Sequence, residues 1–186
     1  DQPETLALNN LRKSLHRLRQ TLRDQEVTPP FLLITPRTIQ FNPNNNYQLD
    51  VAEFSALLDA CQQHSHRHLE TCSACNRRLQ QAAGLYRGDL LQEFFLADSL
   101  AFDEWVLDKR EWLRRQALET FYSLTEFCTR CGEYILAQQY ALRQLDIEPW
   151  RESAHRQLMG LLASRGEYSA ALAQYETCRR ILAEEL

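Results

Sequence analysis

Gly132-Glu133-Tyr134 occurs again as Gly166-Glu167-Tyr168, 34 residues further along the chain. Ala137 has its counterpart in Ala171 at the same offset, and Pro149 stands where the first copy must end. In each copy the glycine suits a tight turn between two helices, and the small alanine lets the second helix approach the first closely. The pattern therefore predicts two consecutive pairs of antiparallel helices towards the C-terminal end.

The period of 34 residues is the length of one tetratricopeptide unit. Such a unit cannot bury its apolar face alone, so neighbouring units stack. Apolar positions follow the same offset, with Leu124 matching Leu158 and Phe127 matching Leu161. We therefore expect a mostly α fold with tetratricopeptide-like repeats at about residues 118–151 and 152–186, a scaffold that binds or positions a partner.

The composition is that of an ordinary globular protein. The 186 residues are 44% hydrophobic and 25% charged, which allows a sizeable core in one or two domains. No apolar run approaches the roughly 18 residues of a membrane span, and the first residues lack the apolar stretch of a signal peptide. These features predict a cytoplasmic protein. Its six cysteines are then expected to be thiols or metal ligands rather than disulfides.

Charge is distributed unevenly along the chain. Residues 1–23 contain five Arg or Lys against Asp1 and Glu4, a net of +3, and the whole chain carries −4, so the remainder carries −7. A basic segment attached to an acidic body indicates that the segment meets a polyanion. Because most prolines also precede residue 50, we divide the chain into an N-terminal part, 1–50, and a helical part, 51–186.

Residues 5–23 have the periodicity of an amphipathic helix. Leucines at spacings of three and four form one stripe, at Leu8, Leu11, Leu15, Leu18 and Leu22. Most polar side chains lie opposite this stripe, and their types suit phosphates and base edges in a DNA major groove. An ordinary solvated helix face is the alternative. The candidate DNA-binding residues of the helix are Asn9, Arg12, Lys13, His16, Arg17 and Gln20.

Short β-prone runs follow this helix after Pro29-Pro30. They cover residues 31–35, 38–41 and 47–49, separated by Pro36-Arg37 and by the Asn-rich residues 42–46. Both separators have turn chemistry, so the sequence leaves open which one is the tip of a hairpin. A basic helix followed by a β-hairpin is the second half of a winged helix, in which Arg37 and the Asn-rich loop would contact the DNA backbone or minor groove.

Cysteine and histidine residues gather between residues 61 and 75. The pattern is Cys-x2-His followed by Cys-x2-Cys, which supplies three thiolates and an imidazole, the ligand set of a structural Zn²⁺. Four protein ligands leave no open position, so such a metal would hold a loop rather than catalyse. The alternative is that these cysteines are small buried apolar side chains. The candidate ligands are Cys61, His64, Cys72 and Cys75, with His66 and His68 in reserve.

Capping residues outline the helices before the repeats. Asp50 is expected to cap a helix over residues 51–61. Gly88 is expected to end a later helix, with Asp89 capping the one that follows. Ser99 is expected to cap a helix of nearly thirty residues, because neither Gly nor Pro interrupts the chain before residue 132.

No catalytic motif accompanies these elements. The five glycines are widely spaced and form no phosphate-binding loop, and there is no nucleophile elbow. Cys128 and Cys178 fall on the inner faces of the repeat helices, where a small apolar side chain is needed. The sequence therefore predicts that the protein is not an enzyme.

Several segments in common order carry a resemblance to a known family. They are Leu85-Tyr86-Arg87-Gly88-Asp89-Leu90-Leu91, Trp105, Ala117-Leu118, Gly132-Glu133-Tyr134, Glu148-Pro149-Trp150-Arg151-Glu152, His155-Arg156-Gln157-Leu158-Met159, Ala171-Leu172, Tyr175 and Leu182-Ala183-Glu184-Glu185-Leu186. Together they resemble the bacterial transcriptional activator domain of the Streptomyces antibiotic regulatory protein family. Upstream, residues 11–19 resemble the recognition helix of that family's OmpR-type winged helix.

The resemblance implies a sequence-specific DNA-binding regulator of bacterial transcription. Its helical domain would mediate homodimer formation or contact RNA polymerase or other protein modules. Two departures are expected: the first sheet and two helices of a complete winged helix are absent, and the Cys/His loop is inserted between the domains. The competing hypothesis is a tetratricopeptide-type peptide-binding scaffold that acts in signalling without binding DNA.

Overall fold

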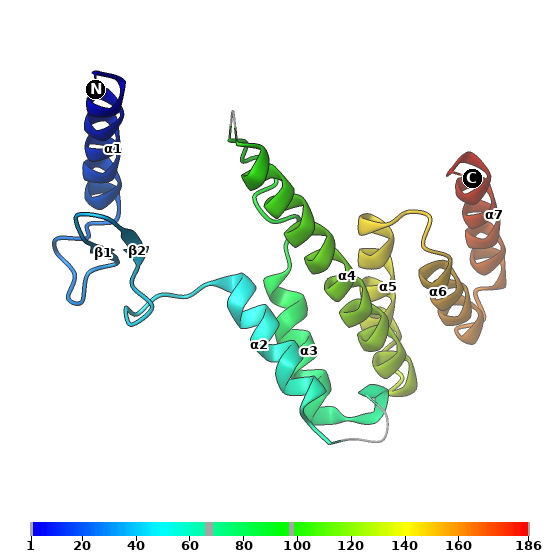
Figure 1. Cartoon of the computed structure of the whole chain (residues 1–186). Helices are drawn as coiled ribbons and strands as arrows, with labels where there is room; N and C mark the ends of the chain where they lie inside the picture. Colours follow the sequence, from blue (N-terminus) through cyan, green and yellow to red (C-terminus); the bar gives the residue numbers. More distant parts are fainter. Residues whose placement is uncertain (1, 66–68, 97–98, 186) are drawn as a thin grey trace. The chain divides into compact units, whose positions relative to one another are not determined.

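The computed structural model describes residues 2–65, 69–96 and 99–185. The chain forms two compact units, Asp1–Gln48 and Leu49–Leu186, which are described separately. The described part contains seven α-helices, one short 3-10 helix and one hairpin of two strands (Figure 1). The expectation of a mostly α fold is confirmed.

The first unit consists of helix α1 (Gln2–Thr21) and an antiparallel hairpin of β1 (Leu32–Ile34) and β2 (Ile39–Phe41). Leu32 pairs with Phe41 and Ile34 with Ile39, so residues 35–38 form the tip. Arg37 is therefore at the tip, which settles the choice that the sequence left open. The Thr35 and Thr38 side-chain oxygens are 2.7 Å apart and join the two sides of this turn.

Buried polar side chains, rather than a large apolar core, hold the first unit together. The Asp24 carboxylate is only 1% exposed; it accepts a hydrogen bond of 3.0 Å from the Leu32 N–H and forms a 2.9 Å ion pair with Arg19. Asp24 thereby connects the end of α1 to the first strand. Asn42 and Asn45 are also buried, and their amides donate to the carbonyls of Pro30 and Pro29. The Asn-rich loop thus turns two of its side chains inward.

The second unit begins with the helices α2 (Asp50–Gln62) and α3 (Ser73–Leu85), with a 3-10 turn, η1 (Leu69–Thr71), between them. The expected Asp50 cap is wrong by one residue, because the cap position is Leu49 and Asp50 already belongs to the helix. Its carboxylate accepts the N–H of the next residue, Val51, at 2.8 Å. An acidic group in this first turn still suits the positive end of the helix dipole.

Four further helices complete the second unit: α4 (Leu100–Arg130), α5 (Tyr134–Ile147), α6 (Glu152–Ser164) and α7 (Tyr168–Glu185). Helix α4 has 31 residues and starts after Ser99, as expected, although the Ser99 side chain makes no capping hydrogen bond. Each helix packs against the next, so α4–α5 and α6–α7 are the two predicted hairpins (Figure 1). Gly132 lies in the turn between α4 and α5, and Gly166 lies in the turn between α6 and α7. Their φ angles are 77° and 79°, a conformation that glycine adopts without strain.

Two clusters of apolar side chains form the core of this unit. The first joins α2, α3 and α4, and the second joins the two hairpins, where Cys128 is fully buried as expected. Cys178 on α7 is also buried. The first cluster includes Phe54, Leu58, Leu79, Ala82, Leu113, Ala117, Phe121 and Leu124; the second includes Cys128, Ala137, Ala141, Leu158, Leu161 and Leu162.

The expected caps at Gly88 and Asp89 are wrong. Helix α3 ends at Leu85 with Tyr86 as its C-cap, and residues 89–96 form turns and loop, with no helix beginning at Asp89. The reason is tertiary, because the Asp89 carboxylate binds Arg114 on α4 instead of the backbone of a new helix. Over the ranges that the structure describes, no helix is both long and apolar enough to cross a membrane.

Candidate functional site

The basic side of α1 is open to solvent. All six candidate DNA-binding residues of this helix are exposed. Arg12 Nη1 lies 3.5 Å from Asn9 Oδ1, a weak contact that leaves both groups accessible. The leucine stripe of the same helix is also largely open, since Leu8, Leu11 and Leu18 are each at least 45% exposed.

Arg37 is exposed at the tip of the hairpin in the same unit. Its backbone N–H donates to Thr35 Oγ1 at 3.3 Å, and the Thr38 N–H donates to the same oxygen at 2.9 Å. These bonds order the backbone of the turn and leave the guanidinium accessible. The structure therefore places all seven candidate DNA-binding side chains in the first unit, six on α1 and one on the hairpin.

Three of the four candidate metal ligands lie together in the second unit. The imidazole Nδ1 of His64 is 3.5 Å from the Cys72 sulfur and 3.2 Å from the Cys75 sulfur. The three potential ligand atoms all lie within 4.8 Å of one another. The residues just after α2, the N-cap of α3 and the first turn of α3 thus supply one ligand each.

The fourth candidate, Cys61, lies beside this cluster but is not part of it. Its side chain is 4% exposed, and its sulfur contacts the Cys75 carbonyl oxygen at 3.6 Å. The reserve candidates His66 and His68 lie outside the described residues. The sequence spacing thus identified three groups that meet and one that is adjacent.

The two cysteines of α3's N-terminal end have different acidities. A hydrogen bond from the Cys75 backbone N–H lowers the pKa of the Cys72 thiol, and the neighbouring Arg78 adds to this effect. Burial raises the pKa of Cys75 to about 11. Start-of-helix N–H groups stabilise a thiolate, whereas an apolar surrounding disfavours one. The thiolate form is therefore favoured more at Cys72 than at Cys75.

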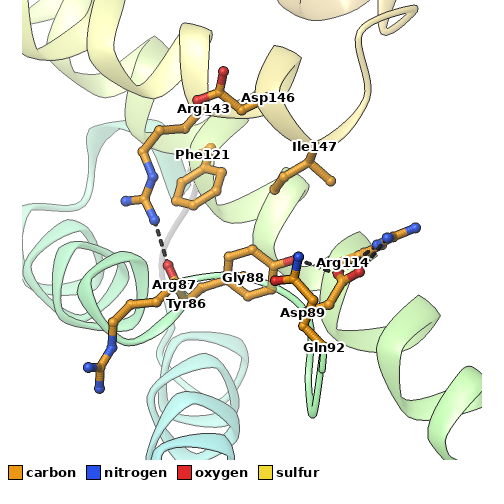
Figure 2. Close-up of a pocket in the computed structure, with 10 residues that line it drawn as sticks. All are labelled: Tyr86, Arg87, Gly88, Asp89, Gln92, Arg114, Phe121, Arg143, Asp146 and Ile147. Carbon is orange, nitrogen blue, oxygen red and sulfur yellow. Dashed lines mark hydrogen bonds and ion pairs between the residues drawn. The ribbon is translucent and has the colours of Figure 1, made fainter. Parts of the chain in front are cut away.

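A polar cleft of about 360 Å³ lies between the residues that follow α3 and the helices α4 and α5 (Figure 2). Arg143 of α5 crosses one wall, with its guanidinium 4.1 Å from the centre of the Phe121 ring. It donates to the carbonyls of Ala83 at 3.0 Å and Tyr86 at 2.6 Å. One side chain therefore connects α5 to the end of α3.

Asp89 and Arg114 form the opposite wall of the cleft in Figure 2. Arg114 Nε donates to the Asp89 carboxylate at 2.8 Å, and this bond is the main reason that the pKa of Asp89 lies below its ordinary value. Burial, followed by the Asp89 charge, raises the pKa of Tyr86 to about 12, so its hydroxyl stays protonated. Because these groups are paired with one another, the cleft has the character of a structural junction rather than a catalytic centre.

Sequence reasoning missed these polar residues, although one signal was available. Leu136, Tyr140, Arg143 and Ile147 fall at helical spacing on one side of α5, so Arg143 is a charge within an apolar stripe. A charge in such a place needs partners, which the carbonyls at the end of α3 supply. No comparable signal identifies the pair of Asp89 and Arg114, because they are 25 residues apart.

Comparison with known proteins identifies a family for the second unit. No curated protein is similar enough to this chain to be matched. The family profile described as "Bacterial transcriptional activator domain" matches residues 49–186, which is the whole of the second unit and most of the chain. The family is one of transcription regulators, and the chain belongs to the bacterial transcriptional activator domain family.

Proposed function

We propose that this chain is part of a DNA-binding transcription regulator, in which the first unit contacts DNA and the second contacts protein partners. The observation that supports this most directly is the open basic side of α1, in a chain whose second unit belongs to a transcriptional activator family.

The electrostatics of α1 favour a polyanion as its partner. Residues 1–23 carry a net charge of +3, whereas the remainder of the chain carries −7. Lys13 and Arg17 are one helical turn apart, both exposed, and no ion pair with an acidic side chain satisfies either of them in the described part. Unpaired, exposed cations on one side of a helix bind phosphates by releasing counterions.

The hairpin suits the role of a wing. It follows the helix closely, and Asp24 connects it to α1 through the Leu32 N–H and Arg19. Arg37 at its tip would then contact phosphate or the minor groove next to the major-groove site of α1. Because Asp24 is buried and holds both elements, the spacing between helix and wing is set within this unit.

The second unit supports the protein-contact role. On α7, the apolar side chains of Tyr168, Leu172 and Tyr175 are 68%, 67% and 51% exposed and recur at helical spacing. Exposed apolar stripes of this kind mark protein-interaction surfaces. The partner would be a second copy of the chain, RNA polymerase or another regulatory module. The same stripe is the observation that favours the competing function, a peptide-binding scaffold without DNA binding.

The test is an electrophoretic mobility shift of the full-length protein on the DNA upstream of its own gene, at several salt concentrations. The double variant Lys13→Ala/Arg17→Ala should bind about tenfold more weakly or worse, and the salt slope should fall by about 2 because two phosphate contacts are lost. The control is Lys109→Ala/Arg115→Ala, which removes the same charge from exposed positions on α4.

If both double variants lost the same DNA affinity, the loss would be a general charge effect, and a role for α1 in DNA binding would be contradicted. If the unsubstituted protein ignored this DNA and random duplexes alike while binding one protein stoichiometrically, the scaffold function would replace the proposal.

A further inference from the structure

We propose that His64, Cys72 and Cys75, completed by Cys61, bind a structural Zn²⁺ ion that holds the connection between α2 and α3. The proposal is independent of DNA binding and concerns how the second unit is stabilised. It rests on three ligating groups, one that follows α2 and two at the N-terminal end of α3, whose ligand atoms lie close together.

The spacing of these groups matches tetrahedral zinc. With Zn–S of about 2.3 Å and Zn–N of about 2.0–2.1 Å, ligand atoms at tetrahedral angles are about 3.6 Å apart for S and N and about 3.8 Å apart for two sulfurs. The distance from His64 Nδ1 to the Cys72 sulfur is 3.5 Å, and that to the Cys75 sulfur is 3.2 Å. For these two pairs of atoms a shift of a few tenths of an ångström would accommodate the ion, whereas the Cys61 side chain would have to rotate towards it.

Cys61 is the fourth ligand in this proposal. It lies in the last turn of α2, and its sulfur already contacts the Cys75 backbone at 3.6 Å. It is 4% exposed, so the metal would be shielded from water on that side. Three thiolates and one imidazole are a standard structural zinc set, and they leave no position for a substrate.

The charge of such a site is also accommodated. Zinc with three thiolates and a neutral imidazole has a net charge of −1. Arg78 Nη1 lies 4.0 Å from the Cys75 sulfur, so a cation stands next to the place where this charge would form. Cationic and hydrogen-bonding neighbours of this type commonly support metal ligands.

Cys61 and Cys75 belong to the first apolar cluster of this unit, but a merely apolar role for these cysteines would not require an imidazole beside the Cys75 sulfur. Cys128 and Cys178 show that role in this same chain, since both are buried in the helical core and neither belongs to a His/Cys cluster among the described residues. Cys72, in contrast, is half-buried and faces an imidazole. The loop that zinc would secure runs from residue 63 to residue 72, where one short 3-10 turn is the only regular element described.

The experiment measures zinc in the whole protein, purified from zinc-supplemented cells without chelators, and then replaces zinc with Co²⁺. We expect about one equivalent of zinc per chain, and tetrahedral Co²⁺ bands with thiolate charge transfer. Cys72→Ser and His64→Ala should lose the metal. Cys61→Ser should lower the charge-transfer intensity by about a third, because one of three thiolates is removed. Cys131→Ser, an exposed cysteine outside the site, is the control and should bind normally.

Alkylation of the unsubstituted protein gives a second measurement that needs no variant to fold. Cys72, which is only half-buried, should resist alkylation until a chelator is added, and the exposed Cys131 should react at once. Less than about a tenth of an equivalent of zinc, with no Co²⁺ bands, would overturn the site. A native mass two hydrogens lower would show a disulfide in its place. Unchanged charge transfer in Cys61→Ser would refute Cys61 as the fourth ligand.

Discussion

Replacing Arg143 by Met tests whether the polar cleft is a structural junction. Methionine keeps the unbranched apolar stem that packs in this position but removes the guanidinium. The lost contacts are the hydrogen bonds to the carbonyls of Ala83 and Tyr86 and the stacking over Phe121. Both carbonyls lie at the C-terminal end of α3, where backbone oxygens have no partner within the helix.

The expected loss follows from these contacts. A hydrogen bond from a charged donor contributes about 1.5–3 kcal/mol, and a cation–π contact about 0.5–2 kcal/mol. Because Arg143 is only half-buried and water can reach the freed carbonyls, we expect Arg143→Met to lower the free energy of unfolding by about 2–4 kcal/mol. With a urea m-value of about 2 kcal/mol/M, the midpoint would fall by about 1–2 M.

The assay is urea unfolding of the full chain followed by the fluorescence of its tryptophans, with Arg115→Met as the matched control. Arg115 is exposed on α4 and makes no hydrogen bond or ion pair within the described ranges. Its replacement should change the free energy of unfolding by less than about 0.5 kcal/mol. If both variants had the same midpoint as the unsubstituted protein, the junction would contribute nothing and the reasoning would be wrong.

Two further predictions concern the repeats and the acid stability of the second unit. Ala137→Leu should lower the free energy of unfolding by about 1–3 kcal/mol through overpacking, because Ala137 is 0% exposed. Ala171→Leu, at the equivalent half-buried position of the second repeat, should have a smaller effect. Calorimetry measures both losses of stability, and equal losses would contradict the repeat geometry. The pKa of Asp89 is depressed by Arg114, so its contribution is present above about pH 4 and is lost as the pH falls through the lower folded pKa. Asp89→Asn should therefore flatten the decrease in melting temperature below pH 4, and an unchanged pH profile would count against this ion pair.

The repeated helices could be predicted because their signals are local and periodic. The glycines, alanines and apolar positions of the two copies share one register, and the structure has α4–α5 and α6–α7 in that register. Helix α1 likewise follows from its leucine spacing, although it begins at Gln2, three residues before the predicted start. Periodicity identifies a helix well and its ends less well, since the ends depend on capping contacts.

The hairpin tip and the caps near residue 88 could not be predicted, for a physical reason that they share. Pro36-Arg37 and residues 42–46 have equally good turn chemistry, so local propensity does not distinguish them. Asn42 and Asn45 decide the choice by binding the carbonyls of Pro30 and Pro29, residues distant in sequence. Asp89 similarly binds Arg114 rather than a nearby backbone. At the hairpin, tertiary hydrogen bonds decide a choice that local propensity leaves open, and at Asp89 one overrides a local expectation.

The candidate metal ligands show what spacing alone can determine. Motif spacing identified His64 after α2, Cys72 just before α3 and Cys75 in its first turn, and these three groups do meet. It could not determine the direction of the Cys61 side chain, which contacts a carbonyl beside the cluster. Cys61 beside the cluster and Cys61 as a fourth ligand differ by a rotation of this one side chain. The sequence carries no information about that rotation, which bound metal would decide.

Buried polar contacts in the repeats point to the way in which the second unit presents its surface. Gln144 of α5 donates to Thr125 of α4 and to Gln157 of α6, and His155 of α6 lies 2.6 Å from the Gln174 amide of α7. Apolar helix faces tolerate sliding and repacking, whereas a buried hydrogen bond is satisfied in one register only. Since such bonds connect each of these helices to the next, we infer that the register of the two hairpins is fixed before any partner arrives. A partner on α7 would then meet a preformed surface and would not have to order it, which lowers the entropic cost of binding.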